Sequence, residues 1–347
     1  MKTIQQNSDF LHIGQKLLLW YGENARNLPW RNTQNPYHIW ISEIILQQTR
    51  VEQGKSYYLK FIEKFKDVES LAKADINEVL LYWKGLGYYS RAINLHKASQ
   101  KIMEEYNGKF PTQYNNILKL KGIGKYTAAA ISSICFNEKI PAVDGNFYRV
   151  LSRIFADEFD ISQTKAHQYF SELALLIMPN EKFGNFNQAI MDLGANVCKP
   201  KNPNCENCPI QKDCLAFFLG KTLDLPVKTK KVKTETWDLK YYFVQYEDCF
   251  LIKQRDENSI WKKLYDFPEN INKKLEPYII KEEYFSHKLT HRNLNITIFT
   301  LKIEEQQIFE NLKLENNFIS IKLKDFYQKP FPKPLENFLE KAVNLIL

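Results

Sequence analysis

The strongest constraint on what this chain can fold into is a run of four cysteines in the segment CKPKNPNCENCPIQKDC. Four thiolates in one short loop, stiffened by prolines, can surround a single metal centre without closing a long loop. Zinc is the generic partner of four cysteines, but zinc ribbons usually join two C-x2-C pairs and this loop has one. The spacing C-x6-C-x2-C-x5-C therefore predicts a metal site and leaves zinc and an iron–sulfur cluster open. The candidate ligands are Cys198, Cys205, Cys208 and Cys214.

Length and composition predict a globular protein of two domains. The chain has 347 residues, of which 44% are hydrophobic and 14% aromatic. No apolar run approaches the 18 or so residues that span a bilayer, and the first residues lack the features of a signal peptide. We therefore expect a cytoplasmic protein with no membrane partner. The formal charge of +8 fits a polyanionic partner, although lysine-rich solubility would give the same charge.

The hydrophobic pattern changes once along the chain. Residues 10–220 repeat apolar positions at intervals of three and four, which predicts an all-α domain ending in the cysteine loop, over residues 1–220. Residues 221–236 are polar and lysine-rich and are expected to form a linker, whose lysines could also lie along phosphates. Residues 237–347 alternate like strands before a final amphipathic helix, which predicts an α+β domain.

One acid interrupts the apolar run WISEIILQQTR. On a helix, Glu43 would be flanked by Ile39 and Leu46 on one side and by Trp40 and Gln47 on the other, with no broad polar face to share. A carboxylate there is either desolvated for a reason or paired with a partner that the sequence does not reveal. The ordinary alternative is a glutamate that reaches past its neighbours to water.

A glycine turn predicts an anion site. The segment LKLKGIGKYTAAAI, residues 118–131, is expected to form a helix, a tight turn and a second helix. Gly122 and Gly124 would permit the turn, and the amides that open the second helix would then face a phosphate between Lys121 and Lys125. Any tight helix connection could use the same glycines. About twenty residues further on, Asp144 precedes another helix, where its ordinary role is that of an N-cap.

The order of these motifs resembles that of a known family. Glu43 within PYHIWISEIILQQTRV is followed by KGIGKYTAAAI, VDGNFYRVLSR, FNQAIMDLGANVC and the cysteine loop. Over roughly residues 10–220 this order resembles the helix–hairpin–helix DNA glycosylases of the endonuclease III type. The resemblance implies a [4Fe–4S] cluster on the four cysteines.

A subgroup of that superfamily is a closer match. The bifunctional glycosylase/lyases carry a nucleophilic lysine where this chain has Tyr126, which cannot form a Schiff base. The chain resembles instead the MutY-type adenine DNA glycosylases, which have that tyrosine, the glutamate of SEIILQQT and a Nudix-like C-terminal domain with an FSH loop. No catalytic Nudix box is found in residues 237–347, so we expect no Nudix hydrolysis.

The resemblance implies a role for each carboxylate. Glu43 matches the general acid that protonates adenine before the N-glycosidic bond breaks, since the adenine anion is a poor leaving group. Asp144 matches the residue that stabilises the oxocarbenium-like sugar, electrostatically or through a transient covalent bond. Tyr126 and Asn146 match residues that support the reaction centre.

The resemblance also implies contacts with a flipped base and its duplex. The residues expected to line the adenine pocket are Trp30, Arg31, Leu46, Val51 and Gln188. Those expected to touch DNA are the wedge residues Gln48 and Tyr88, the opposing-base contacts Thr49 and Leu86, and the hairpin residues Lys121, Gly122, Gly124 and Lys125. Those expected to recognise 8-oxoguanine are Phe285, Ser286 and His287.

The expected activity is removal of adenine opposite 8-oxoguanine or guanine in duplex DNA, by a monomeric, nucleoid-associated bacterial enzyme. One alternative is a monofunctional glycosylase acting on thymine or uracil, against which the FSH element argues. Another is a non-catalytic DNA-binding iron–sulfur protein, which would lack one of the two carboxylates. Individual residues also have ordinary readings, since Tyr88 could be a plain aromatic and His287 a surface histidine on a loop.

Overall fold

The computed structural model describes residues 10–230 and 234–344. The described chain divides into two compact units. One unit holds the residues up to Lys73 and those from Asn94 to residue 230, and the other holds Ala74–Ile93 and the residues from 234 onward. The domain boundaries at residues 220 and 237 stay predictions, and part of the expected linker, residues 231–233, lies outside the described residues.

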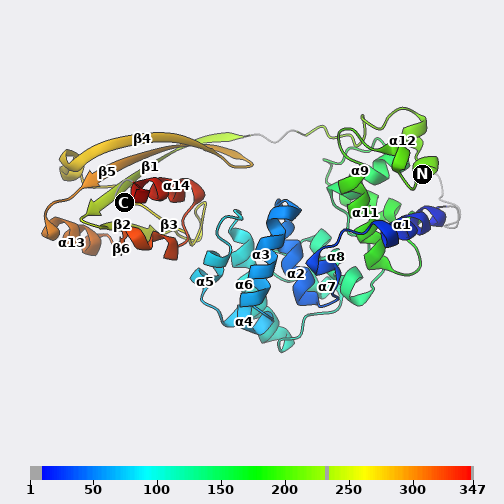
Figure 1. Cartoon of the computed structure of the whole chain (residues 1–347), viewed down its shortest axis with the longest axis horizontal. Helices are drawn as coiled ribbons and strands as arrows, with labels where there is room; N and C mark the ends of the chain where they lie inside the picture. Colours follow the sequence, from blue (N-terminus) through cyan, green and yellow to red (C-terminus); the bar gives the residue numbers. More distant parts are fainter. Residues whose placement is uncertain (1–9, 231–233, 345–347) are drawn as a thin grey trace. The chain divides into compact units, whose positions relative to one another are not determined.

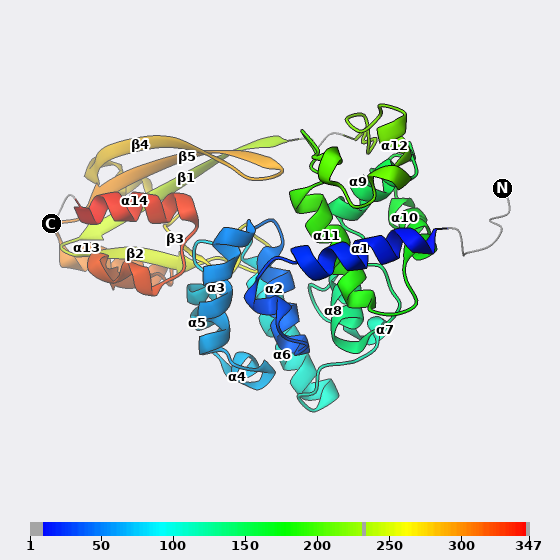
Figure 2. The ribbon, with the colours of Figure 1, turned by 45° about the vertical axis from the view of Figure 1, so that its right-hand side comes forward.

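The first unit is helical, as the apolar spacing predicted, and its described residues form no strand. Its helices bury their apolar stripes in a common core, in which α1 lies beside α11 (Figure 2). Short polar connections separate the helices, and several begin at a side-chain cap, such as Asn35 before α2. The helices are α1 (Leu11–Asn24), α2 (Pro36–Leu46), α3 (Val51–Lys64), α4 (Val68–Lys73), α6 (Ser90–Tyr106), α7 (Tyr114–Ile117), α8 (Lys125–Phe136), α9 (Gly145–Ile154), α10 (Ala166–Ile177), α11 (Phe183–Asn196) and α12 (Leu215–Phe218), with 3-10 turns η1 (Pro29–Arg31), η2 (Cys205–Asn207) and η3 (Gln211–Asp213). The first four residues of α6 belong to the second unit.

The glycine hairpin differs from its prediction in one respect. The first helix, α7, ends at Ile117, so residues 118–120 form turns and not the helix that the sequence predicted. Gly122 has a φ of 80°, and a Cβ atom there would lie 2.7 Å from Cβ of Asn94, so only glycine fits. Gly124 has a φ of −94° and open space around it, so its small size leaves the backbone accessible.

The second unit contains a mixed sheet with strand order β3-β2-β1-β5-β4, and β6 pairs with β2. Strands β1 and β5 run parallel, with Trp237 opposite Leu294, whereas the other pairs are antiparallel. Helix α14 packs against one face of this sheet (Figure 1). The elements are α5 (Ile76–Tyr82), β1 (Glu235–Tyr246), β2 (Cys249–Gln254), β3 (Tyr265–Asp266), η4 (Lys273–Tyr278), β4 (Ile279–Lys288), β5 (Arg292–Lys302), α13 (Gln306–Glu315), β6 (Ile319–Lys322), η5 (Leu323–Gln328) and α14 (Lys333–Asn344).

The expected fold class, an all-α domain followed by a smaller α+β domain, is confirmed. The sequence predicted the secondary structure of two segments in the second unit incorrectly. Phe285, Ser286 and His287 lie in strand β4 and not in a loop, because β4 pairs with β5 along this stretch. Strand β1 begins at Glu235, inside the stretch expected to be linker. No helix in the described part of the chain is long and apolar enough to cross a membrane.

Candidate active site

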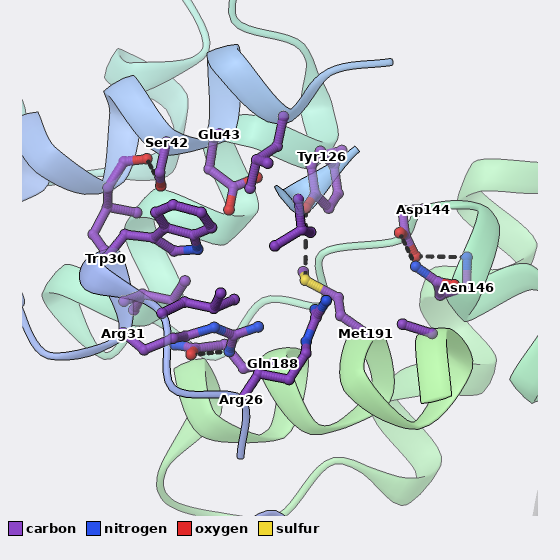
Figure 3. A pocket seen from close by; sticks show the side chains of 16 residues that line it. Arg26, Trp30, Arg31, Ser42, Glu43, Tyr126, Asp144, Asn146, Gln188 and Met191 are labelled. Atoms are coloured by element: carbon purple, nitrogen blue, oxygen red, sulfur yellow. Dashed lines mark hydrogen bonds between the residues drawn. The ribbon is translucent and has the colours of Figure 1, made fainter. Parts of the chain in front are cut away.

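A cavity of about 190 Å³ opens among the helices of the first unit (Figure 3). Its walls come from η1, α2, α8 and α11, and from the start of α3 and α9. Nine of the residues that the sequence predicted for the reaction centre and adenine pocket line it together, although the chain separates them by up to 158 residues. These nine are Trp30, Arg31, Glu43, Leu46, Val51, Tyr126, Asp144, Asn146 and Gln188.

Glu43 projects from α2 into this cavity (Figure 3). Its neighbours in the helix, Ile41, Ser42, Ile44 and Ile45, are all buried, and the Glu43 side chain is itself half-buried. Burial raises the pKa of Glu43, and the nearby Asp144 raises it further, while a hydrogen bond from Tyr126 and the charge of Arg31 oppose the rise. Glu43 is therefore an acid that holds its proton more tightly than an exposed glutamate.

Tyr126 stands at the start of α8, on the opposite wall. Its hydroxyl hydrogen-bonds Glu43 and also lies 3.6 Å from Sδ of Met191. Burial and the two carboxyls, Glu43 and Asp144, raise the pKa of Tyr126 well above its usual range. The phenol therefore stays protonated and acts as a hydrogen-bond donor in the cavity.

Asp144 is the N-cap of α9, so its ordinary role is present in the structure. Its Oδ1 accepts from the amides of Asn146 and Phe147 at 2.8 and 2.9 Å, and its Oδ2 accepts from Nδ2 of Asn146 at 2.8 Å. Burial raises the pKa of Asp144, and these three hydrogen bonds, with the charge of Arg149, act against that rise. On balance burial raises the pKa of both carboxyls, but the site supplies Asp144 with three N–H donors that favour its ionised form and supplies Glu43 with fewer.

A chain of hydrogen bonds leads from Asp144 to the cysteine loop. Arg149 donates to Oδ1 of Asn146 at 2.8 Å and to the carbonyl of Cys198 at 2.7 Å. The same guanidinium donates to the carbonyl of Gly194 at 2.8 Å. A Cβ atom at Gly194 would lie 2.7 Å from Cβ of Asn146, so the close approach of α11 to α9 requires glycine here.

Arg31 and Gln188 form the polar wall of the cavity. Arg31 donates to Oε1 of Gln188 and, at 2.8 Å, to the hydroxyl of Tyr21, which in turn donates to the same Oε1 at 2.7 Å. Behind them lies Asp192, whose side chain is fully buried. Asp192 pairs with Arg31 at 3.1 Å and with Arg26 at 2.5 Å, which fixes the guanidinium of Arg31 beside the cavity.

The four cysteines lie together at a second small cavity, beside Arg153. Arg153 is buried and donates to Sγ of Cys198 at 3.2 Å and to the carbonyl of Lys199 at 2.8 Å. Four soft sulfur donors around one cavity, with a cation at hydrogen-bond distance from one of them, fit a thiolate-bound metal group. Among the described residues, however, no three side chains of His, Cys, Asp or Glu are placed to hold a single ion.

The predicted DNA-contact residues lie in several parts of the chain. Gln48 follows α2 with a φ of 58° and is exposed, as are Lys121 and Lys125 beside the hairpin. Tyr88 is 47% exposed, whereas Leu86 is only 7% exposed, which leaves little of its side chain for a base. The other residues predicted to contact the duplex or the lesion are Thr49, half-buried after α2, and Phe285, Ser286 and His287, which line a cavity between β4 and α14.

Several residues of the main cavity were not predicted. Arg26 and Met191 line it, and Tyr21 and Asp192 support it from behind. A buried ion pair between residues 26 and 192 leaves no local pattern in the sequence. Asp192 does, however, lie on the same face of α11 as Gln188, four residues earlier, and that spacing was a usable signal.

Comparisons with known proteins follow the same division. A model of the HhH-GPD superfamily of base excision DNA repair proteins matches residues 41–174, and a NUDIX domain model matches residues 241–341. The adenine DNA glycosylase of Buchnera aphidicola subsp. Schizaphis graminum (strain Sg) is 36% identical over 348 residues, which cover 94% of this chain and 98% of that protein. The chain belongs to the adenine DNA glycosylase family.

As a member of the adenine DNA glycosylase family, the chain is a base-excision repair enzyme that hydrolyses N-glycosidic bonds. A thermostable thymine-DNA glycosylase shares its fold with a TM-score of 0.56 and 33% identity, over 60% of this chain and 96% of that one. A trapped covalent intermediate of endonuclease III with DNA aligns with a TM-score of 0.54, over 62% of this chain and 99% of that one. At 20% identity, this second likeness shows the fold alone.

Proposed function

We propose that the enzyme, acting as a monomer, removes adenine that is paired with 8-oxoguanine or guanine in duplex DNA. The observation that carries this proposal is that Glu43 and Asp144 line the same cavity. Tyr126 lines it with them. An enzyme that acts on a base within a duplex must extrude it into such a pocket. The family to which the chain belongs supplies the base, adenine.

The first chemical step is proton transfer from Glu43. Adenine leaves poorly as an anion, so a ring nitrogen must gain a proton as the N-glycosidic bond lengthens. Burial raises the pKa of Glu43, which keeps a proton on its carboxyl at a pH where an exposed glutamate has lost it. The hydroxyl of Tyr126 faces the carboxyl from the opposite wall.

The second step needs a negative charge near the sugar. Loss of protonated adenine leaves an oxocarbenium-like carbon, and Asp144 stabilises it electrostatically or through a transient bond. Asn146 holds one oxygen of Asp144 through its side-chain amide. Position 126, which holds the nucleophilic lysine in the bifunctional enzymes, is a tyrosine here. The reaction therefore ends with hydrolysis and makes no Schiff base, as expected of a monofunctional glycosylase.

The pocket and its surroundings divide the remaining tasks. Trp30, Leu46 and Val51 provide apolar walls for the adenine ring, and Arg31 with Gln188 provides its polar contacts. Gln48 and Tyr88 enter the duplex beside the extruded base, while Thr49 and Leu86 meet the base left behind; Leu86 would have to move outward to do so. The amides after Gly122, with Lys121 and Lys125, hold a DNA phosphate.

We further propose that Cys198, Cys205, Cys208 and Cys214 bind a [4Fe–4S] cluster. The four cysteines meet at one cavity beside Arg153, and their C-x6-C-x2-C-x5-C spacing resembles the one that endonuclease III-type glycosylases use for such a cluster. Bound there, the cluster would tie the loop together. The purified protein is expected to contain iron and acid-labile sulfide, and a colourless zinc protein would refute this proposal.

Recognition of 8-oxoguanine is assigned to strand β4 in the second unit. Phe285 and His287 are half-buried and Ser286 is exposed, and all three line the cavity between β4 and α14. Burial lowers the pKa of His287, so its ring is neutral at physiological pH and can both donate and accept a hydrogen bond. Ser286 offers a hydroxyl to the lesion.

The test is an opposing-base series. Duplexes that pair adenine with 8-oxoguanine, guanine or cytosine, and one that pairs thymine with guanine, are incubated with the enzyme and then treated with alkali to cleave abasic sites. We expect strand cleavage at adenine opposite 8-oxoguanine and guanine, and none at thymine. Release of thymine would favour the rival activity suggested by the thymine-DNA glycosylase fold. Equal release opposite cytosine would refute recognition of 8-oxoguanine or guanine as the opposing base.

A further inference from the structure

The loop that presents Tyr88 adopts a conformation that ordinary residues avoid. Gly85 and Gly87 have φ values of 93° and 70°, and Tyr88 itself has a φ of 48°. A bulky residue in the left-handed region is strained, so neighbouring groups must hold it there. The ring of Tyr88 is nonetheless 47% exposed, so burial of Tyr88 does not explain its conformation.

Two groups contact this loop: Thr290, whose hydroxyl hydrogen-bonds the hydroxyl of Tyr88, and Arg91. Its guanidinium lies 5.6 Å from the centre of the Tyr88 ring and 5.2 Å from that of the Trp83 ring. Nη2 donates to the carbonyl of Leu86 at 3.2 Å and to that of Gly87 at 3.3 Å, and Nε1 of Trp83 donates to the same Gly87 carbonyl at 3.1 Å. One side chain therefore contacts every residue from 86 to 88.

The position of Arg91 is unusual for an arginine. It lies in the first turn of α6, where the helix dipole disfavours a cation, and it is only 8% exposed. Burial lowers the pKa of Arg91 to about 10, so the guanidinium still carries its charge at neutral pH. A helix-opening residue chosen for stability alone would be acidic or small and polar. The position of Arg91 is explained if the loop Leu86–Tyr88 needs a planar cation packed against it.

We propose that Arg91 is a positioning residue that preforms the Leu86–Tyr88 loop, so that Tyr88 meets the duplex already ordered. This inference rests on the proposed entry of Tyr88 into DNA. A planar guanidinium can face two rings while donating to two carbonyls, and a lysine ammonium, a compact charge on a flexible stem, would hold this arrangement less rigidly. Preforming the loop avoids the entropy of ordering it on binding, which strengthens binding of the mispaired duplex.

The test is a double-mutant cycle of Arg91→Lys and Tyr88→Ala in the full chain. Each variant is titrated with the adenine–8-oxoguanine duplex, and single-turnover excision is measured at saturating enzyme. We expect Arg91→Lys to weaken binding about tenfold and to change the saturated rate much less. In the Tyr88→Ala background, Arg91→Lys should weaken binding no further, because the two residues act through one loop.

Each other outcome overturns the inference. The inference fails if Arg91→Lys binds the duplex within about twofold of the unmodified enzyme. It also fails if Arg91→Lys loses the same affinity in the Tyr88→Ala background as in the unmodified enzyme, because that result indicates a structural role alone. If Tyr88→Ala itself binds normally, the wedge role fails with it, while adenine excision by the unmodified enzyme still stands. Ile102→Val, in the buried face of α6, controls for loss of stability alone. If Arg91→Lys does not fold, Trp83→Phe takes its place, because it removes the indole donor to Gly87. We expect Trp83→Phe to weaken duplex binding in the unmodified enzyme and not in the Tyr88→Ala background. Additive losses of binding energy from the two substitutions would refute the inference.

Discussion

Glu43→Gln should lower the single-turnover rate of adenine excision by about a thousandfold, within the range that a general acid contributes. The amide fits the same cavity and can still hydrogen-bond Tyr126, but it has no proton to give to the base. Because burial disfavours the charged form of Glu43, the substitution removes no stabilising charge, and thermal stability should be unchanged or higher. Single-turnover kinetics and a thermal melt of the same preparation measure both.

A matched control separates the acid from the substitution itself. Glu63→Gln places the same change on an exposed position of α3, and its excision rate should equal that of the unmodified enzyme. Binding of the adenine–8-oxoguanine duplex by Glu43→Gln should also stay within a few-fold of normal. Excision by Glu43→Gln at more than a tenth of the normal rate would show that another group supplies the proton.

Asp144→Asn should lower the excision rate by about a hundredfold to a thousandfold, which is the usual effect of removing a charge that stabilises a transition state. Asparagine caps helices as well as aspartate does, so α9 should keep its N-terminus, with a modest loss of stability because the new amide loses the hydrogen bond from Nδ2 of Asn146. The loss would then report the missing charge beside the sugar and not an unfolded helix. Circular dichroism and a thermal melt check that the Asp144→Asn protein remains folded.

Asp75 offers the control for this experiment. It caps α5 through the amide of Asn77 at 2.8 Å, as Asp144 caps α9. Asp75→Asn makes the same change at a cap that lines no cavity with Glu43, and excision should be unaffected. If both variants lost activity equally, or neither did, Asp144 would be a structural cap only.

Much of this account could be predicted before the structure, for reasons that differ from residue to residue. The helical unit follows from apolar spacing, and the proposed cluster site follows from cysteines that are close in sequence. Glu43 was recognisable as an unusual acid because its helix offers no polar face. Its partners were a different matter, since Tyr126 and Asp144 become neighbours only through the packing of α2, α8 and α9, and resemblance to the family was needed to join them.

The failures have physical causes as well. The sequence of strand β4 shows no clear alternation of apolar and polar residues, and the strand forms because it pairs with β5. The FSH segment was therefore wrongly expected in a loop. Helix α3 was not singled out, because its apolar positions, among them Tyr58 and Phe61, are few within a polar sequence. The network of Arg26, Arg31 and Asp192 joins the two ends of the helical unit, and no local pattern predicts which buried charges will meet.

The central claim is that burial keeps a proton on Glu43 while Asp144, held by three N–H donors, carries the charge. The pH dependence of single-turnover excision, on duplex bound at saturation, tests it most directly. The rate should fall at low pH as Asp144 gains a proton, and it should fall again as the pH rises through the pKa of Glu43, which lies above the usual 4.5. The remaining activity of Glu43→Gln should lack the fall on the alkaline side. A rate that stays level or rises on that side in the unmodified enzyme, or an alkaline fall that survives in Glu43→Gln, would contradict the assignment of Glu43 as the acid.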